Sequence, residues 1–164
     1  MEAPTGCGEC MSEQLSPHFT VADLSRSQTA TRLEIDNTPD AVSVENLRAL
    51  CLNVLEKVRA NYGSVYIDSG FRGLVLNMRI GGAKNSQHQT GEAADIVVSG
   101  VSNRDLFCWI KAHLQFDQLI LEFDDPKTHG GWVHVSFSKT KNRNQCLVAV
   151  HAQSGKTEYH PWVD

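Results

Sequence analysis

The order in which helix-like and strand-like segments follow one another along this chain limits the folds that it can adopt. One long stretch has apolar residues at helical spacing, over residues 38–63, and only one other long helix is expected, over residues 102–114. Short strand-like segments occupy residues 64–68, 93–98, 117–123, 132–137, 145–151 and 156–159. Most of these strands have no helix between them that could make a parallel crossover. The order predicts an α+β fold: a single domain with a central, mainly antiparallel sheet packed by helices.

Capping residues set the expected helix boundaries. Thr38 is the predicted N-cap of the first long helix, with Pro39 in its first position, and Gly63 is predicted to end it. Capping boxes mark two more helix starts, Thr20 with Asp23 and Ser102 with Asp105. Shorter helices are expected over residues 27–35 and 73–80, and a closing hairpin around residues 153–155.

Length and charge narrow the class of protein. The chain has 164 residues, which fits one domain over residues 15–164 preceded by a flexible tail over residues 1–14. Lys and Arg number 15 against 19 Asp and Glu, so the net charge is −4 and no basic run favours nucleic-acid binding. No apolar stretch approaches the roughly 20 residues of a membrane span.

The N-terminus and the cysteines give no evidence for a secretory signal, a disulfide scaffold or a complete metal site. Residues 1–15 lack the basic and apolar regions of a secretory signal, so synthesis in the cytoplasm without a signal peptide is expected. Five cysteines are an odd number, which argues against a disulfide scaffold. Cys51 and Cys108 are expected to be buried thiols. Cys7 and Cys10 have the spacing of a metal clip, but no second pair follows, so a polar tail is the favoured interpretation.

A glycine-rich segment over residues 69–96 carries most of the candidate functional residues. Its apolar content is low, and loops of this composition usually position side chains rather than fill a core. The candidate functional residues within it are Arg72, Ser86, His88, Glu92 and Asp95.

Asp95 lies in a strand made mostly of Ala, Ile and Val, and alternation gives it a face shared with Ala93 and Val97. An unpaired charge there is costly to bury, and a metal ion held with the loop residue His88 would remove that cost. For these two residues alone, a solvated His–Asp pair is the favoured interpretation.

His134 adds a third candidate ligand. Alternation in residues 132–137 places it on the face opposite Val133 and Val135, which suit the core. A lone strand histidine is more often structural, but with His88 and Asp95 it would complete the three-ligand set that catalytic zinc uses, with water in the fourth position. Glu122 could then carry the proton and Arg72 could polarise a carbonyl, although position alone favours a surface charge for each.

Together these segments resemble the M15 family of zinc peptidases, the peptidoglycan D-Ala-D-Ala carboxypeptidase group, and most closely its short subfamily from phages, prophages and bacteria. The likeness spans about residues 15–137 and is carried by SGFR, by GGAKNSQHQTGEAADI, by FDQLILEF and by WVHVSF. It implies a small α+β fold shared with the hedgehog signalling domain. It also implies one zinc ion per chain on His88, Asp95 and His134, with Arg72 at the substrate carbonyl and Ser86 holding the substrate.

One position departs from the family pattern. Several branches place the catalytic acid three residues before the last ligand, where this chain has Gly131, and others place a histidine two residues before it, where this chain has Trp132. The resemblance to the hedgehog arrangement makes Glu122 the best replacement. Alternative proton carriers lie in the intervening segment: Asp124, Asp125 and His129.

The sequence therefore predicts a zinc metallopeptidase, a carboxypeptidase or endopeptidase that hydrolyses the peptidoglycan stem peptide by attack of a zinc-bound water. Trp132 is expected to line the substrate cleft, and the protein is expected to be a monomer that acts on the cell wall, as a phage or prophage lytic enzyme. Two alternatives stay open. Gly131 in place of the acid would suit a zinc-containing binding module, a pseudoenzyme that recognises cell-wall or protein ligands, and the chain could also be a component of a phage particle.

Overall fold

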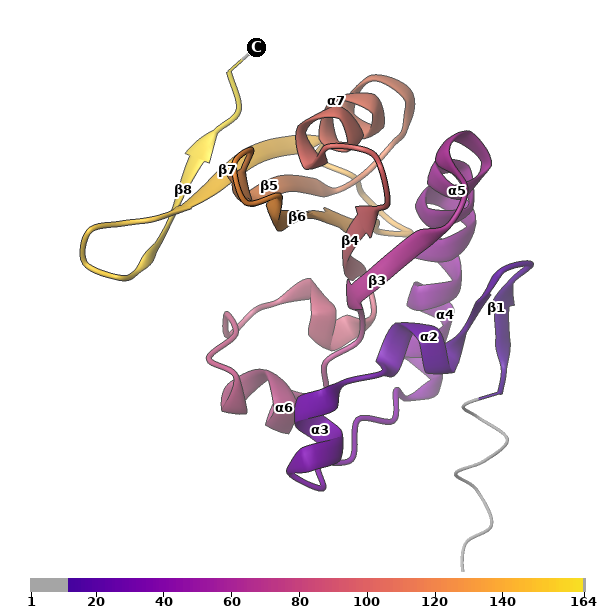
Figure 1. The fold of residues 1–164 in the computed structure, drawn as a ribbon. Helices are drawn as coiled ribbons and strands as arrows, with labels where there is room; N and C mark the ends of the chain where they lie inside the picture. The colour runs from indigo at the N-terminus through magenta and orange to yellow at the C-terminus, as the bar shows by residue number, and fades with distance from the viewer. Residues whose placement is uncertain (1–11, 164) are drawn as a thin grey trace, which may run out of the picture.

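A six-stranded sheet runs through the fold (Figure 1). Alternation of its side chains gives this sheet an apolar face and a polar face. The strands lie in the order β3 (Val65–Ser69), β4 (Ala93–Val98), β6 (Gly130–Ser136), β5 (Gln118–Asp125), β7 (Gln145–His151) and β8 (Thr157–Pro161). Every neighbouring pair is antiparallel except β5 and β7, which are parallel. The predicted α+β class with a mainly antiparallel sheet is confirmed.

The computed structural model describes residues 12–163. Cys7 and Cys10, for which a polar tail was the favoured interpretation, lie outside the described residues, as does most of that expected tail. Glu13 and Gln14 are described, and Gln14 begins β1 (Gln14–Ser16), which forms a small hairpin with β2 (Phe19–Thr20) that the sequence did not predict.

The core lies on one face of the sheet. Leu119 and Leu121 of β5 and Val133 and Val135 of β6 point into it. Three helices supply the other side of this core: α4 (Ala41–Leu50), α5 (Glu56–Tyr62) and α7 (Asn103–His113). In Figure 1, α7 lies over β4, β5 and β6, and α5 lies beside β3. The opposite face is therefore left to the polar residues that alternate with this core.

The first long helix differs from its prediction at its start and in its middle. Asp40 is the N-cap, and its carboxylate accepts a hydrogen bond from the Ser43 amide at 2.7 Å, whereas Thr38 donates its amide to Asp36. The predicted cap at Thr38 is wrong because the helix begins two residues later, where the Asp40 carboxylate takes that role. A π-helical turn, η1 (Cys51–Leu55), joins α4 to α5, and Gly63 follows the last turn with a φ of 88°.

Shorter elements position the polar loops. The capping box of Thr20 and Asp23 begins α2 (Val21–Ser25), and α3 (Gln28–Arg32) follows. Next along the chain after β3 come α6 (Leu74–Arg79) and the 3₁₀ turn η2 (Gln87–Thr90). Ser102 is the N-cap of α7 as predicted: its hydroxyl accepts a hydrogen bond from the Asp105 amide and donates one to the Asp105 carboxylate. The predicted hairpin of β7 and β8 is also present.

The cysteine prediction is half right. Cys51 is fully buried in the core, but Cys108 is exposed. Leu106, Phe107 and Ile110 form the buried stripe of α7, and position 108 falls outside that stripe at helical spacing. Among residues 12–163, no helix combines the length and apolarity needed to cross a membrane.

Candidate metal centre

His88 is held with one ring nitrogen free to act as a ligand. It lies in η2, where the Ser86 hydroxyl accepts a hydrogen bond from the His88 amide at 3.3 Å. Its ring Nδ1 lies 2.6 Å from the carbonyl oxygen of Gly70, and the side chain is 2% exposed. A carbonyl can only accept, so we assign the proton to Nδ1, which leaves the lone pair of Nε2 available for a metal.

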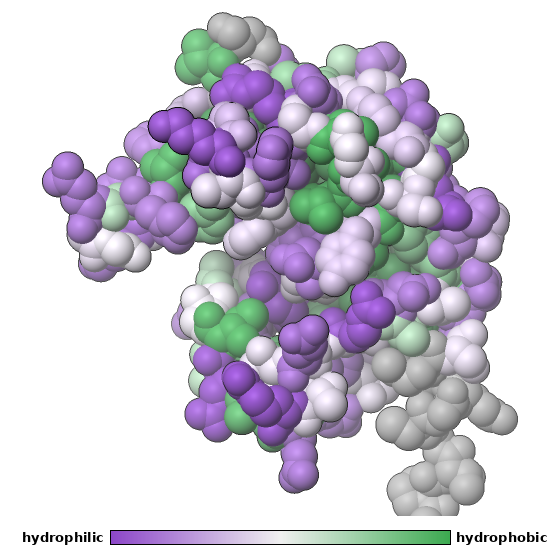
Figure 2. Space-filling view, viewed as in Figure 1, coloured by the Kyte–Doolittle hydropathy of each residue, from purple (hydrophilic) through white to green (hydrophobic). Residues whose placement is uncertain are grey.

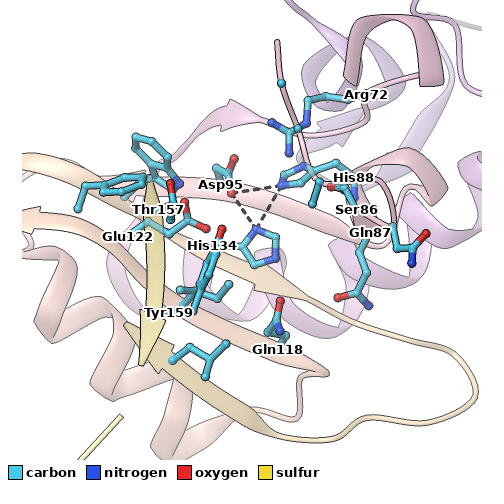
Figure 3. A pocket seen from close by; sticks show the side chains of 18 of the residues that line it. Arg72, Ser86, Gln87, His88, Asp95, Gln118, Glu122, His134, Thr157 and Tyr159 are labelled. Atoms are coloured by element: carbon cyan, nitrogen blue, oxygen red, sulfur yellow. Dashed lines mark hydrogen bonds and ion pairs between the residues drawn. The ribbon is translucent and has the colours of Figure 1, made fainter. Parts of the chain in front are cut away.

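Asp95 and His134 face each other across neighbouring strands. They are register partners in the β4–β6 pair, both on the polar face of the sheet, and His134 Nδ1 lies 2.9 Å from Asp95 Oδ1. His88 Nε2 lies 3.3 Å from the same carboxylate oxygen and 3.2 Å from His134 Nδ1 (Figure 3). The structure thus brings the three predicted ligands to one point.

The spacing of these three atoms suits a tetrahedral metal. With ligand bonds of about 2.0–2.1 Å, neighbouring ligand atoms of a tetrahedral zinc site lie about 3.3 Å apart. The nitrogen and oxygen donors here are 2.9–3.3 Å apart, and all three residues are buried. Burial alone would raise the pKa of Asp95, but the adjacent His88 and His134 more than offset this and keep it well below its usual range. The donors therefore fit a divalent cation.

Glu122 stands beside this group on β5. It pairs in register with Trp132 of β6 and so points to the same face as His134. Burial raises the pKa of Glu122 to about 7, the negative charge of Asp95 adds to the rise, and His134 and Arg72 oppose it. A carboxyl group poised near neutral pH can both accept and donate a proton.

Gly131 explains why the acid of other branches is missing at its position. Its φ is 84°, and a Cβ atom added there would lie 2.3 Å from the carbonyl oxygen of Glu122 and 2.6 Å from that of Phe123. The register of β5 and β6 shifts between Glu122 and Asp125, so the two chains approach closely at this point. No side chain fits at position 131 without a shift of this backbone, and Glu122 on the facing strand lines the cleft.

We expect Gly131→Ala to lower the free energy of unfolding by about 3 kcal/mol or more, because left-handed strain of about 1–2 kcal/mol adds to the overlap with two carbonyl groups. Gly155→Ala is the matched control: its φ is 78° but no atom lies within 4 Å of the added Cβ. Urea denaturation of both variants separates the two contributions. Equal losses in the two variants would contradict the close approach at Gly131.

Arg72, Ser86 and Trp132 complete the set predicted from the sequence. The Arg72 amide donates to the carbonyl of His88 at 3.0 Å, and its guanidinium Nε is buried without a hydrogen-bond partner in the described residues. The indole N–H of Trp132 is also buried without a partner of good geometry, although it lies near Glu122 and slightly offsets the rise in its pKa. Buried donors without partners are rare, and both belong to the wall of one cavity.

That cavity is an open cleft of about 570 Å³ that contains all the predicted site residues. Figure 2 shows it as a notch between the protruding β7–β8 hairpin and the segment that carries α6. The segment over residues 81–88 forms one wall, and side chains from the polar face of the sheet form the other: Gln118, Ile120, Glu122, Trp132 and His134. Its volume lies in the range of ligand-binding clefts, and the three donor residues line it.

Comparison with known protein families decides which proteins this site belongs with. The family model described as Peptidase M15 matches residues 17–136. This range includes the three donor residues together with Glu122 and Arg72. The chain belongs to the M15 peptidase family. Peptidases of this family depend on a metal, and the buried His–Asp–His group is where this chain could bind one. A search of curated proteins returns no significant match.

The alternative proton carriers do not reach the centre of this M15 peptidase. Asp125 accepts hydrogen bonds from the Lys127 amide and the Thr128 hydroxyl in its own turn. Asp124 and His129 line other cavities, at the far end of β5 and near the start of α7. Glu92 bonds to Thr90 and does not line the cleft. Among the described residues that line the cleft, Glu122 is the carboxyl group outside the three-donor set.

Sequence reasoning missed several residues around the centre. Gly70 orients His88, and its own Cβ position is blocked by the carbonyl of Leu24, so only glycine fits there. Asp117 accepts hydrogen bonds from Gln87 and from the Arg143 guanidinium, at 2.9 and 2.8 Å, and so fastens the segment next to His88 to β5. SGFR contains a visible signal for Gly70, but nothing local marks the long-range partners of Asp117.

We expect Asp117→Asn to destabilise the fold by about 2 kcal/mol at pH 7, because Arg143 and Gln87 lose a buried acceptor. The hydrogen bonds from Arg143 lower the pKa of Asp117 below 3.8. Its contribution is therefore fully present above that value and is lost as the pH falls through the lowered pKa. Denaturation at pH 7 and pH 3 should show the gap between wild type and variant narrowing, and a constant gap would exclude the carboxylate charge as its source.

Proposed function

We propose that this M15 peptidase is a zinc enzyme that hydrolyses peptide bonds in the stem peptide of peptidoglycan. The observation that carries the proposal is the buried His88–Asp95–His134 group, which opens into a cleft with Glu122 on one side and Arg72 on the other. Two histidines and one carboxylate are a donor set of catalytic zinc, which uses three protein ligands. Zinc bound there would supply a Lewis acid and lower the pKa of a coordinated water towards 7.

The residues of the chain have separate roles in this proposal. A carboxylate oxygen of Glu122 takes the proton of the attacking water and later gives it to the nitrogen of the leaving amine. The guanidinium of Arg72, whose Nε has no partner in the described residues, binds the carbonyl oxygen of the scissile bond. Ser86 and Trp132 line the cleft and hold the substrate.

The stem peptide as substrate and the single zinc ion rest on the resemblance in SGFR, S-x-H-x6-D and W-x-H. The proposal also includes a monomer that acts at the cell wall as a phage or prophage lytic enzyme. The competing interpretation as a binding module or pseudoenzyme depended on Gly131. Glu122 lies in the cleft with a pKa raised to about 7, and this favours catalysis over binding alone.

The experiment that tests the proposal is mass spectrometry of the soluble products released from purified peptidoglycan by zinc-loaded protein, with a chelated sample as control. Release of alanine or stem peptides that stops with the chelator supports the proposal, and the product masses identify the bond. If nothing is released while one zinc ion per chain is bound, the peptidoglycan peptidase is excluded and the binding module becomes the better explanation.

A further inference from the structure

The β7–β8 hairpin forms part of the cleft although it lies beyond the part of the chain that matches the family. The match ends at residue 136, and the hairpin spans residues 145–161. Leu147 of β7 and Thr157 and Tyr159 of β8 line the same cavity as the three metal donors. Figure 3 shows Thr157 and Tyr159 facing the space beside Glu122 and His134. The hairpin therefore adds a wall that the family pattern does not describe.

Strand register aligns Tyr159 with Glu122. Glu122 pairs with Ala149 of β7, and Ala149 pairs with Tyr159 of β8, so the three residues form a row across the sheet. Two strand spacings separate Glu122 from Tyr159, which is roughly 10 Å between backbones. The residue between them, Ala149, is 1% exposed and does not line the cleft, so this end of the cleft is bounded by Glu122 and Tyr159 themselves.

Tyr159 is a hydrogen-bond donor without a partner in the protein. Within residues 12–163 its hydroxyl makes no hydrogen bond, and the residue is 53% exposed although it lines the cleft. Partial burial raises the pKa of Tyr159 above its usual value, and the charges of Glu122 and Asp95 add to this rise while Arg72 opposes it. The phenol is therefore protonated at neutral pH and able to donate.

The hairpin is anchored near its turn by His151 and at its base by Trp162, so the position of this donor is set in advance. The His151 ring stacks on Phe123 with centroids 4.1 Å apart, and Trp162 packs on Phe107 of the core at 4.5 Å. The Trp162 amide also donates to the carbonyl of Cys146 at 3.0 Å. Because the hairpin is already ordered, substrate binding does not have to offset the entropy cost of ordering it.

We propose that Tyr159 is a substrate-contacting residue, whose hydroxyl donates a hydrogen bond to a main-chain carbonyl of the bound peptide on the side of Glu122 away from the metal donors. The proposal rests on the peptidase function proposed above and extends it: the β7–β8 hairpin selects which peptides lie correctly across the metal centre. Tyr159 is a specificity-determining residue, since it positions the peptide and takes no part in the proton transfer.

The test compares Tyr159→Phe with Tyr66→Phe in zinc-loaded full-length protein. Tyr66 lies on β3 at the opposite edge of the sheet, is 57% exposed, and does not line the cleft, so it controls for the loss of a tyrosine hydroxyl. The probe is a synthetic stem pentapeptide that contains both an L-Ala-D-Glu and a D-Ala-D-Ala bond. Turnover is followed by mass spectrometry and binding by calorimetry, with zinc content and melting temperature measured for each variant.

For Tyr159→Phe we expect KM to rise about 10-fold while kcat stays within about twofold of wild type, and we expect the peptide to bind about 10-fold more weakly. The reason is that the variant loses one neutral hydrogen bond, which the wild type makes equally to the substrate and to the transition state. Tyr66→Phe should behave as wild type. An active wild type with an unchanged Tyr159→Phe variant overturns this proposal and leaves the peptidase function standing. A wild type that binds the peptide without cleaving it, with binding weakened in Tyr159→Phe, overturns the peptidase function and supports the contact. A wild type that neither binds nor cleaves overturns both.

Discussion

Replacing Glu122 by Gln is expected to lower kcat by about 10²–10⁴-fold while zinc stays bound, because the variant keeps the shape of the side chain and loses only its ability to take a proton. Glu122 is not one of the three donors of the metal group. Hydrolysis of the stem pentapeptide by zinc-loaded protein, together with zinc content by atomic absorption, measures both parts of the prediction.

Glu92→Gln is the matched control for this variant. Glu92 belongs to the same polar segment as the candidate ligands, but its carboxylate bonds to Thr90 and lies outside the cleft. We expect it to keep wild-type turnover. If Glu122→Gln keeps wild-type turnover as well, Glu122 has no part in the proton transfer.

The stability of Glu122→Gln provides an independent check on the environment of this residue. Burial raises the pKa of Glu122 to about 7, so above this pH the metal-free fold holds a charged carboxylate that the unfolded chain would solvate better. The neutral amide removes this cost. The metal-free variant should therefore be at least as stable as the wild type at pH 8, as is common where a side chain serves function at the expense of stability.

Two kinds of information determined how far the sequence could predict this site. Alternation in β4 and β6 gave the face of Asp95 and of His134 correctly, because a strand inside a sheet has only two faces. The loop residue His88 has no such constraint: ligand chemistry made it a candidate partner of the two strand residues, and the resemblance then assigned it as one. Its actual restraint, the carbonyl of Gly70, comes from a segment 18 residues away.

The wall of the cleft that the β7–β8 hairpin forms could not be predicted from the sequence, for a different reason. The hairpin of β7 and β8 was predicted from its local pattern, but its place in the sheet depends on the parallel pairing of β7 with β5. No turn or spacing within residues 145–161 specifies that pairing, so Thr157 and Tyr159 could not be assigned to the cleft. The same limit applies to the π turn in the long helix, which local periodicity cannot distinguish from regular helix.

The role of Asp95 leads to the other large expected effect. Asp95→Asn should weaken zinc binding by about 10²-fold or more and abolish turnover, because the site loses its only negative charge among the three donors. In the wild type, the carboxylate lies within 3.3 Å of the donor nitrogens of both His88 and His134, so it also holds the two rings in position. Competition with a chromogenic chelator measures the affinity.

Asp68→Asn separates this effect from a general change of charge near the centre. Asp68 is exposed on β3, and it is close enough for the charge of Asp95 to contribute to raising its pKa, but it is not a member of the metal group. We expect the zinc affinity of Asp68→Asn to lie within about threefold of that of wild type.

The melting temperature makes the same distinction by another route. A ligand that binds only the folded state, at a concentration of 100 times its Kd, adds about 2.7 kcal/mol of stability. Zinc should therefore raise the melting temperature of wild type and of Asp68→Asn but leave that of Asp95→Asn unchanged, and an equal rise in all three would mean that the metal binds elsewhere on the chain.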